Sequence, residues 1–192
     1  MKSGLGREAR FDRYFEGYQK RVVLDRNGEE QIKYVYVLDY YRPQLTEKSF
    51  IVRKIINIVL FLISAAAQVY SGLMPNIIMN HVQYMGFAQC LGILAMILIV
   101  VYICTHAAAP YTMEIRTYKG AHEKFRIASL ISAIILAAIF ITGIITLIIF
   151  KSFNFMSFVW AFMYLIAAAC LFVIWFLEQK TGYDRVPPDS VF

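Results

Sequence analysis

The hydrophobic positions of this chain fall in four long runs, and most polar positions lie before, between and after them. The runs cover approximately residues 55–74, 83–105, 127–150 and 155–177. Each has about 20 residues or more, which at ~1.5 Å per residue covers the ~30 Å hydrocarbon layer of a bilayer. Lipid offers no hydrogen bonds to the backbone, so such runs must be helical. The pattern predicts an all-α polytopic membrane protein with a four-helix transmembrane bundle at 47–177.

Ahead of the first run, residues 21–38 alternate between apolar and polar positions around the pair Asn27-Gly28. This predicts a β-hairpin, and two registers are open. A two-residue loop pairs residues whose numbers sum to 55, and a three-residue loop pairs those that sum to 54. Only the second register puts Val22 on the face of the later apolar residues. Because a one-residue slip turns every side chain to the other face, the second register, with a bulge at Gly28, is favoured.

A two-stranded hairpin is marginally stable in water, so its apolar face needs a cover. The segment 9–19 has aromatic residues at helical spacing and predicts a short amphipathic helix that would supply one. The inner membrane surface and a partner protein are the alternatives. Pro43 ends the extended segment, and Thr46 is a plausible N-cap for a helix from about Glu47 into the first span. Residues 1–46 therefore form the expected N-terminal unit, an anchoring subdomain or a docking module.

The connection 110–126 has a second amphipathic pattern, with apolar residues recurring on one face and basic residues elsewhere. It predicts an extension of the third membrane helix, weakened near Gly120. The extension would lie in the membrane interface, press against the hairpin or engage a partner. The candidate interaction surface joins both units through six residues: Tyr34, Tyr36, Leu38, Ile115, Tyr118 and Phe125.

Charge predicts the orientation. Eighteen of the nineteen Lys and Arg residues lie in 1–54, in 107–126 or after Leu177, and none lies in 75–82. Basic residues favour the cytoplasmic side of a membrane, so both termini are expected inside the cell and the protein in the cell membrane. This asymmetry accounts for the net charge of +6, and nucleic-acid binding is not predicted. Residues 178–192, with two adjacent prolines, are expected to be a mobile cytoplasmic tail.

The expected spans contain no charged residue between 55 and 105, nor from 127 to 150. Ion-coupled carriers usually hold charge inside the bundle, so such a carrier is disfavoured. The first span instead has a polar stripe, and its members serve either helix packing or a path for a solute. They are Asn57, Ser64, Gln68 and Ser71.

The residues available for catalysis near the inner face have no metal-binding or nucleophile spacing: His106, Glu114, His122 and Glu123. We therefore expect no enzyme, no catalytic or metal site and no cofactor. The leading interpretation is a non-enzymatic accessory, scaffolding or regulatory subunit that binds a protein partner or a second copy of itself. A small transporter or channel for a neutral or lipophilic solute is the alternative, and an intramembrane enzyme the third.

Overall fold

The computed structural model describes residues 17–24, 30–75 and 77–188. Within these ranges, four helices are long and apolar enough to cross a membrane, which confirms the predicted helical bundle. They are α2 (Glu47–Leu73), α4 (Gln83–Ala108), the continuous helix Ile115–Ile149 and α7 (Phe155–Gln179). The third consists of α5 (Ile115–Tyr118), the π-helical η1 (Lys119–Lys124) and α6 (Phe125–Ile149).

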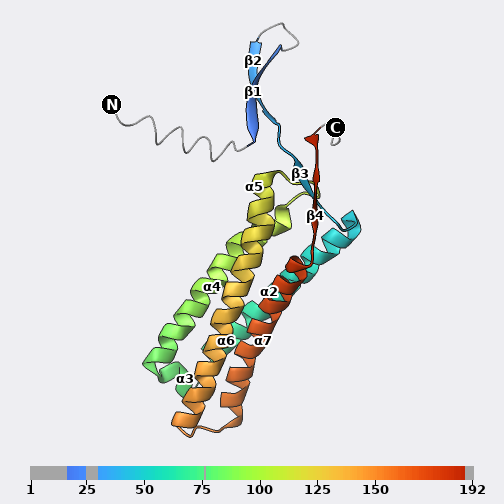
Figure 1. Ribbon diagram of the computed structural model, residues 1–192. Helices are drawn as coiled ribbons and strands as arrows, with labels where there is room; N and C mark the ends of the chain where they lie inside the picture. The colour runs from blue at the N-terminus through green and yellow to red at the C-terminus, as the bar shows by residue number, and fades with distance from the viewer. Residues whose placement is uncertain (1–16, 25–29, 76, 189–192) are drawn as a thin grey trace, which may run out of the picture.

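The four helices run side by side, with strands at one end and the short helix α3 (Ile78–His81) at the other (Figure 1). We call these the strand end and the loop end. Helix α6 packs against α4 and α7, and α2 packs against α7. Two helices begin as their sequences require. Thr46 Oγ1 accepts a hydrogen bond from Ser49 N at 3.3 Å, and Asn154 Oδ1 accepts one from Ser157 N at 2.7 Å.

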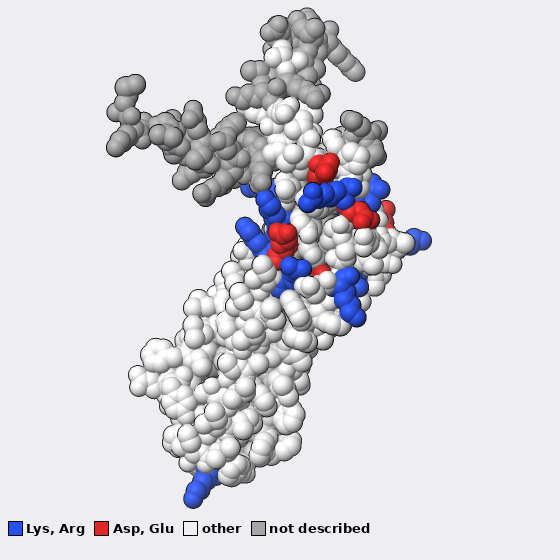
Figure 2. Space-filling model, viewed as in Figure 1, with Lys and Arg blue, Asp and Glu red and all other residues white. Residues whose placement is uncertain are grey.

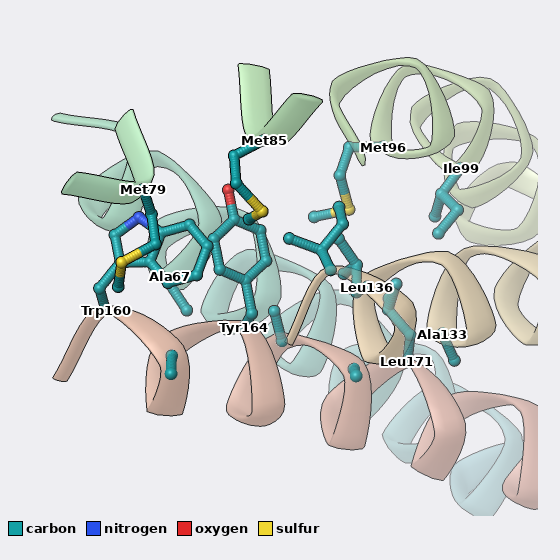
Figure 3. Close-up of a cluster of buried hydrophobic side chains, with 14 of the residues drawn as sticks. Ala67, Met79, Met85, Met96, Ile99, Ala133, Leu136, Trp160, Tyr164 and Leu171 are labelled. Carbon is teal, nitrogen blue, oxygen red and sulfur yellow. The ribbon is translucent and has the colours of Figure 1, made fainter. Parts of the chain in front are cut away.

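The core lies where α7 faces the other helices. In Figure 3, Trp160 and Tyr164 of α7 point toward methionines of α3 and α4. Both rings are buried, and Trp160 reaches the backbone of α6 at Gly143. A Cβ added to Gly143 would lie 2.4 Å from Trp160 Cζ3, so only glycine permits this approach. Small residues thus set the distance between α6 and α7.

Two short antiparallel sheets lie at the strand end of the described chain. In the first, β1 (Tyr18–Leu24) pairs with β2 (Glu30–Tyr36), with Val22 opposite Ile32. The turn residues 25–29 and residues 9–16 of the expected helix lie outside the described residues. Residues 18 and 19, which the helix was expected to include, belong to β1.

In the second sheet, β3 (Tyr40–Pro43) pairs with β4 (Tyr183–Val186). A mobile tail was expected over 178–192; within this range α7 continues to Gln179, and Tyr183–Val186 pair with β3. The pairing is extended by a hydrogen bond of 2.8 Å from Gln44 N to Gly182 O, and Tyr41 also bridges to Met113. The three segments together cover the strand end of the bundle.

Candidate functional site

Four polar side chains are buried together where the bundle meets the strands. They come from α2, α4, η1 and α7, and each is at most 3% exposed: Asn57, His106, His122 and Glu178. We call them the polar cluster. Glu178 places a carboxylate in a nearly water-free environment, which is costly unless its oxygens are paired.

The hydrogen bonds of the polar cluster assign its protons. Asn57 Nδ2 donates to Glu178 Oε1 at 2.8 Å and lies 3.1 Å from His106 Nε2. His106 Nδ1 lies 2.9 Å from the carbonyl oxygen of Ala121, which can only accept. His106 therefore has its proton on Nδ1 and accepts from Asn57 through Nε2. His122 Nδ1 donates to Glu178 Oε2 at 2.8 Å, so both carboxylate oxygens are paired.

The local backbone positions these groups. Ala121 and His122 lie in η1, where the wider π-helical turn interrupts the long third helix. Such segments are rare and occur frequently at functional sites. Gly120 in the same segment lowers the helix preference, which agrees with the weakness expected there.

Two cations of α2 lie at the carboxyl ends of neighbouring helices. Arg53 Nη1 donates to the carbonyl of Leu177 at 2.9 Å, and Lys54 Nζ donates to the carbonyls of Ala107 and Ala109. Positive charge is favourable at a helix carboxyl terminus, where backbone carbonyls lack partners. These contacts join the first span to the ends of α7 and α4 next to the polar cluster.

Aromatic rings cover the polar cluster from the strand side. The ring of Tyr183, in β4, lies 4.4 Å from that of His122, and Tyr118 stacks on Tyr41 at 4.2 Å. Burial, and next the nearby Glu178 carboxylate, raise the pKa of Tyr183 above its usual value, so its phenol stays neutral. Rings from β3, α5 and β4 thus shield the polar cluster from water.

The four side chains of the polar cluster bond mainly to one another and to the backbone of η1. Among the described residues, its one fully buried side-chain atom without a hydrogen-bond partner is Asn57 Oδ1. No group of three or more His, Cys, Asp or Glu side chains in the described chain is arranged to hold a metal ion. The arrangement fixes a buried carboxylate between two imidazoles and connects three of the four spans to η1.

The predicted polar stripe is buried along α2, but its members differ in their contacts. Asn57 belongs to the polar cluster. Ser64 Oγ donates to Ala167 O at 3.0 Å, and Ser71 Oγ lies 3.0 Å from Ala67 O and 3.4 Å from Trp160 O. Gln68 has no partner for either amide atom within the described residues. It lines a lateral groove of about 470 Å³ between α2 and α4, together with Gln89.

The six residues of the expected interaction surface do not share one exposed face. Tyr34 and Leu38 are exposed, whereas Tyr36 and Phe125 are buried. The Tyr36 hydroxyl accepts a 2.9 Å hydrogen bond from Ile115 N, which ties β2 to α5. The Phe125 ring packs on His106, and Tyr118 belongs to the aromatic cover.

Sequence reasoning missed Glu178, because it lies one residue beyond the expected fourth span. A signal was present: an acidic residue in the last turn of a helix opposes the helix dipole and therefore needs a specific partner. His106 and His122 were considered only as residues for catalysis, and their meeting through Asn57 and Glu178 depends on tertiary structure.

No known protein family, curated protein or solved structure matches this chain. Its function is therefore argued from its own residues.

Proposed function

We propose that the chain is a non-enzymatic accessory, scaffolding or regulatory subunit of the cell membrane, with both termini and its interaction surface in the cytoplasm. Charged side chains gather at the strand end, as Figure 2 shows, while Lys151 is the one basic residue between 150 and 155 at the loop end. The positive-inside preference supports a cytoplasmic strand end.

The observation that carries this proposal is the hairpin β1–β2, which extends beyond the bundle and the second sheet (Figure 1). Its exposed side chains include Val22, 64% exposed, with Tyr34 and Val35 on opposite faces of β2 at 40% and 37%. A two-stranded ribbon with exposed apolar side chains is marginal in water, and within the described residues neither of its outer edges pairs with a further strand. Pairing with a strand of a partner, or of a second copy, would satisfy both needs.

The polar cluster suits a regulatory role because it makes the cytoplasmic parts continuous with the spans. Tyr36 ties β2 to α5, and Tyr183 packs β4 against His122. A partner that moved the hairpin would thus act on a segment that is bonded to α4 and α7 and, through Asn57, connected to α2. For partner binding to regulate the spans through this connection, the polar cluster must have two alternative arrangements, and the partner must favour one of them.

Affinity capture of the full chain in mild detergent, after crosslinking in cells, tests the proposal. We expect the wild type to bring down a partner protein or a second copy. A Val22→Thr, Val35→Thr variant keeps strand preference but loses apolar surface, and should lose that species. Arg185→Gln, an exposed change on β4, is the matched control. A wild-type monomer recovered without partner or second copy contradicts the proposal.

The orientation has its own test. A tag fused ahead of Met1, and another after Phe192, should be protected from added protease in intact cells and cleaved after permeabilisation. Cleavage of either tag in intact cells contradicts the proposed topology.

The lateral groove supports a second candidate, a small carrier or channel for a neutral or lipophilic solute. Ser64 and Ser71 are engaged by backbone carbonyls, and of the stripe residues it is Gln68 that lines the groove, with neither amide atom hydrogen-bonded within the described residues. Flux in reconstituted vesicles that is unchanged by Gln68→Leu combined with Ser64→Ala would remove this candidate. The enzyme interpretation would need a metal or cofactor bound to the purified protein.

A further inference from the structure

A basic hollow lies at the strand end, between the last turn of α4 and the start of the third membrane helix. Its volume is about 700 Å³. One wall comprises Thr105, Ala108 and Ala109, and the other comes from α5 and η1. Three cationic side chains line it, those of Arg116, Lys119 and Lys124. The one carboxylate in its lining is that of Glu114. Glu114 Oε1 also accepts a 2.5 Å hydrogen bond from the Tyr18 hydroxyl, so the carboxylate is already engaged on one side.

The helical spacing explains why the cations face one hollow. Arg116, Lys119 and Lys124 are three and five residues apart, and the π-helical turn of η1 intervenes. Gly120 lies between them in the lining, and a Cβ added there would meet no atom within 4 Å. The floor of the hollow is therefore open backbone, which a ligand can approach closely.

The position of the hollow beside a membrane helix favours the phosphate of a lipid headgroup over a small soluble anion. It adjoins the end of α4, a helix apolar enough to span the membrane. At helical spacing below Thr105 of the hollow, α4 has three exposed apolar residues: Val101, Leu98 and Leu94. A phospholipid has its charged headgroup next to its acyl chains. Chains lying along this face of α4 would bring the phosphate to the level of the cations, whereas a soluble anion would gain nothing from the apolar strip.

From these observations we infer that the hollow is a binding site for the headgroup of an anionic phospholipid, with the acyl chains along α4. Basic pockets beside membrane helices favour such headgroups through charge complementarity. The inference is independent of the proposed partner and of the compartment that the strand end faces, since it needs only a bilayer around α4.

The test uses the full chain, purified from mixed vesicles of phosphatidylcholine and phosphatidylglycerol and washed in neutral detergent. Native mass spectrometry then counts retained lipid. We expect one phosphatidylglycerol per chain, and weaker retention by Lys119→Gln, Lys124→Gln, on the order of 30-fold for two charges at a membrane surface. Lys48→Gln, Lys180→Gln removes two charges from the same end outside the hollow and should retain lipid within about twofold.

Gly120→Leu provides an independent variant, because it fills the hollow and leaves every charge in place. It should fold, since its Cβ enters open space, and should lose phosphatidylglycerol. Equal retention by Gly120→Leu and the wild type overturns the inference, as does equal retention of phosphatidylcholine. Release of the lipid by millimolar inorganic phosphate would make the site one for a small soluble anion and would also overturn it.

Discussion

At the scale of single residues, Glu178 is the side chain on which the strand end most depends. Replacing it by alanine leaves His122 Nδ1 and one Asn57 proton without their acceptor in a buried site. Each buried donor left without a partner costs about 1–3 kcal/mol, so we expect Glu178→Ala to lower the free energy of unfolding by about 2–6 kcal/mol in mixed micelles.

Glu178→Gln tests whether the negative charge of this side chain or its shape stabilises the fold. Its amide keeps one acceptor oxygen, so a smaller loss of about 1–3 kcal/mol is expected. Glu47→Gln, on the exposed first turn of α2, should cost less than about 1 kcal/mol. Equal stability of Glu178→Ala and Glu47→Gln would show that the polar cluster contributes nothing to folding.

For Gln68, in contrast to Glu178, we expect that removing the polar group stabilises the protein. Both of its amide atoms are buried without a partner among the described residues, so Gln68→Leu removes an unpaired polar group of similar size. We expect the free energy of unfolding to rise by about 1–3 kcal/mol. Gln89→Leu is the control: its Nε2 donates to Asn80 Oδ1 at 2.8 Å, and losing that bond should destabilise. A destabilised Gln68→Leu would contradict this view of the groove.

The sequence allowed the polar stripe to be located, because polar residues in an apolar run are conspicuous. It did not allow the cluster to be assembled. Asn57, His106, His122 and Glu178 come from four segments, and their meeting depends on how the helices pack. Tyr36 and Phe125 show the related difficulty: an amphipathic pattern marks an apolar face without saying whether the protein itself covers it.

At the scale of elements, the distance between α6 and α7 depends on Gly143. Gly143→Ala places a methyl group 2.4 Å from Trp160 Cζ3, and overpacking of this kind costs about 1–3 kcal/mol. The matched change Gly86→Ala in α4 meets no atom within 4 Å and should stabilise by up to about 1 kcal/mol. Unfolding in mixed micelles compares the two, and equal effects would exclude the contact with Trp160 as the cause.

Helix starts were more predictable than helix ends. Thr46 was expected to cap α2, and it does, because a side-chain cap is a local signal. Hydropathy marks the part of a helix that lipid surrounds, so the helices α4 and α7 run beyond the expected spans to Ala108 and Gln179. The π-helical turn of η1 is bonded to His106 and Glu178, and no local sequence pattern contains these distant contacts.

At the scale of the whole molecule, the pairing of β3 with β4 closes the strand end. A chain ending after Gly182 lacks β4 and should leave β3 without its partner. We expect faster amide hydrogen exchange over Tyr40–Pro43, measured by mass spectrometry in detergent. A chain ending after Pro188 keeps β4 and is the control. Unchanged exchange in the shorter chain would mean that the bridge from Tyr41 to Met113 suffices to hold β3.

The helical bundle could be predicted from the sequence because a bilayer requires every long apolar run to satisfy its own backbone hydrogen bonds, and a helix does so. The second sheet could not, since four-residue strands carry little pattern and their partners are distant. Gln44 and Asp184, joined by a 2.6 Å hydrogen bond, are 140 positions apart.

That separation has a consequence for biosynthesis. The ribosome releases β3 before the four described spans, whereas β4 emerges after them. Until β4 has been made, β3 can pair within the described residues only with Met113, through the bridge at Tyr41. The sheet β3–β4 can therefore form only after all four described spans have been synthesised, which makes it one of the last contacts that the described chain can acquire.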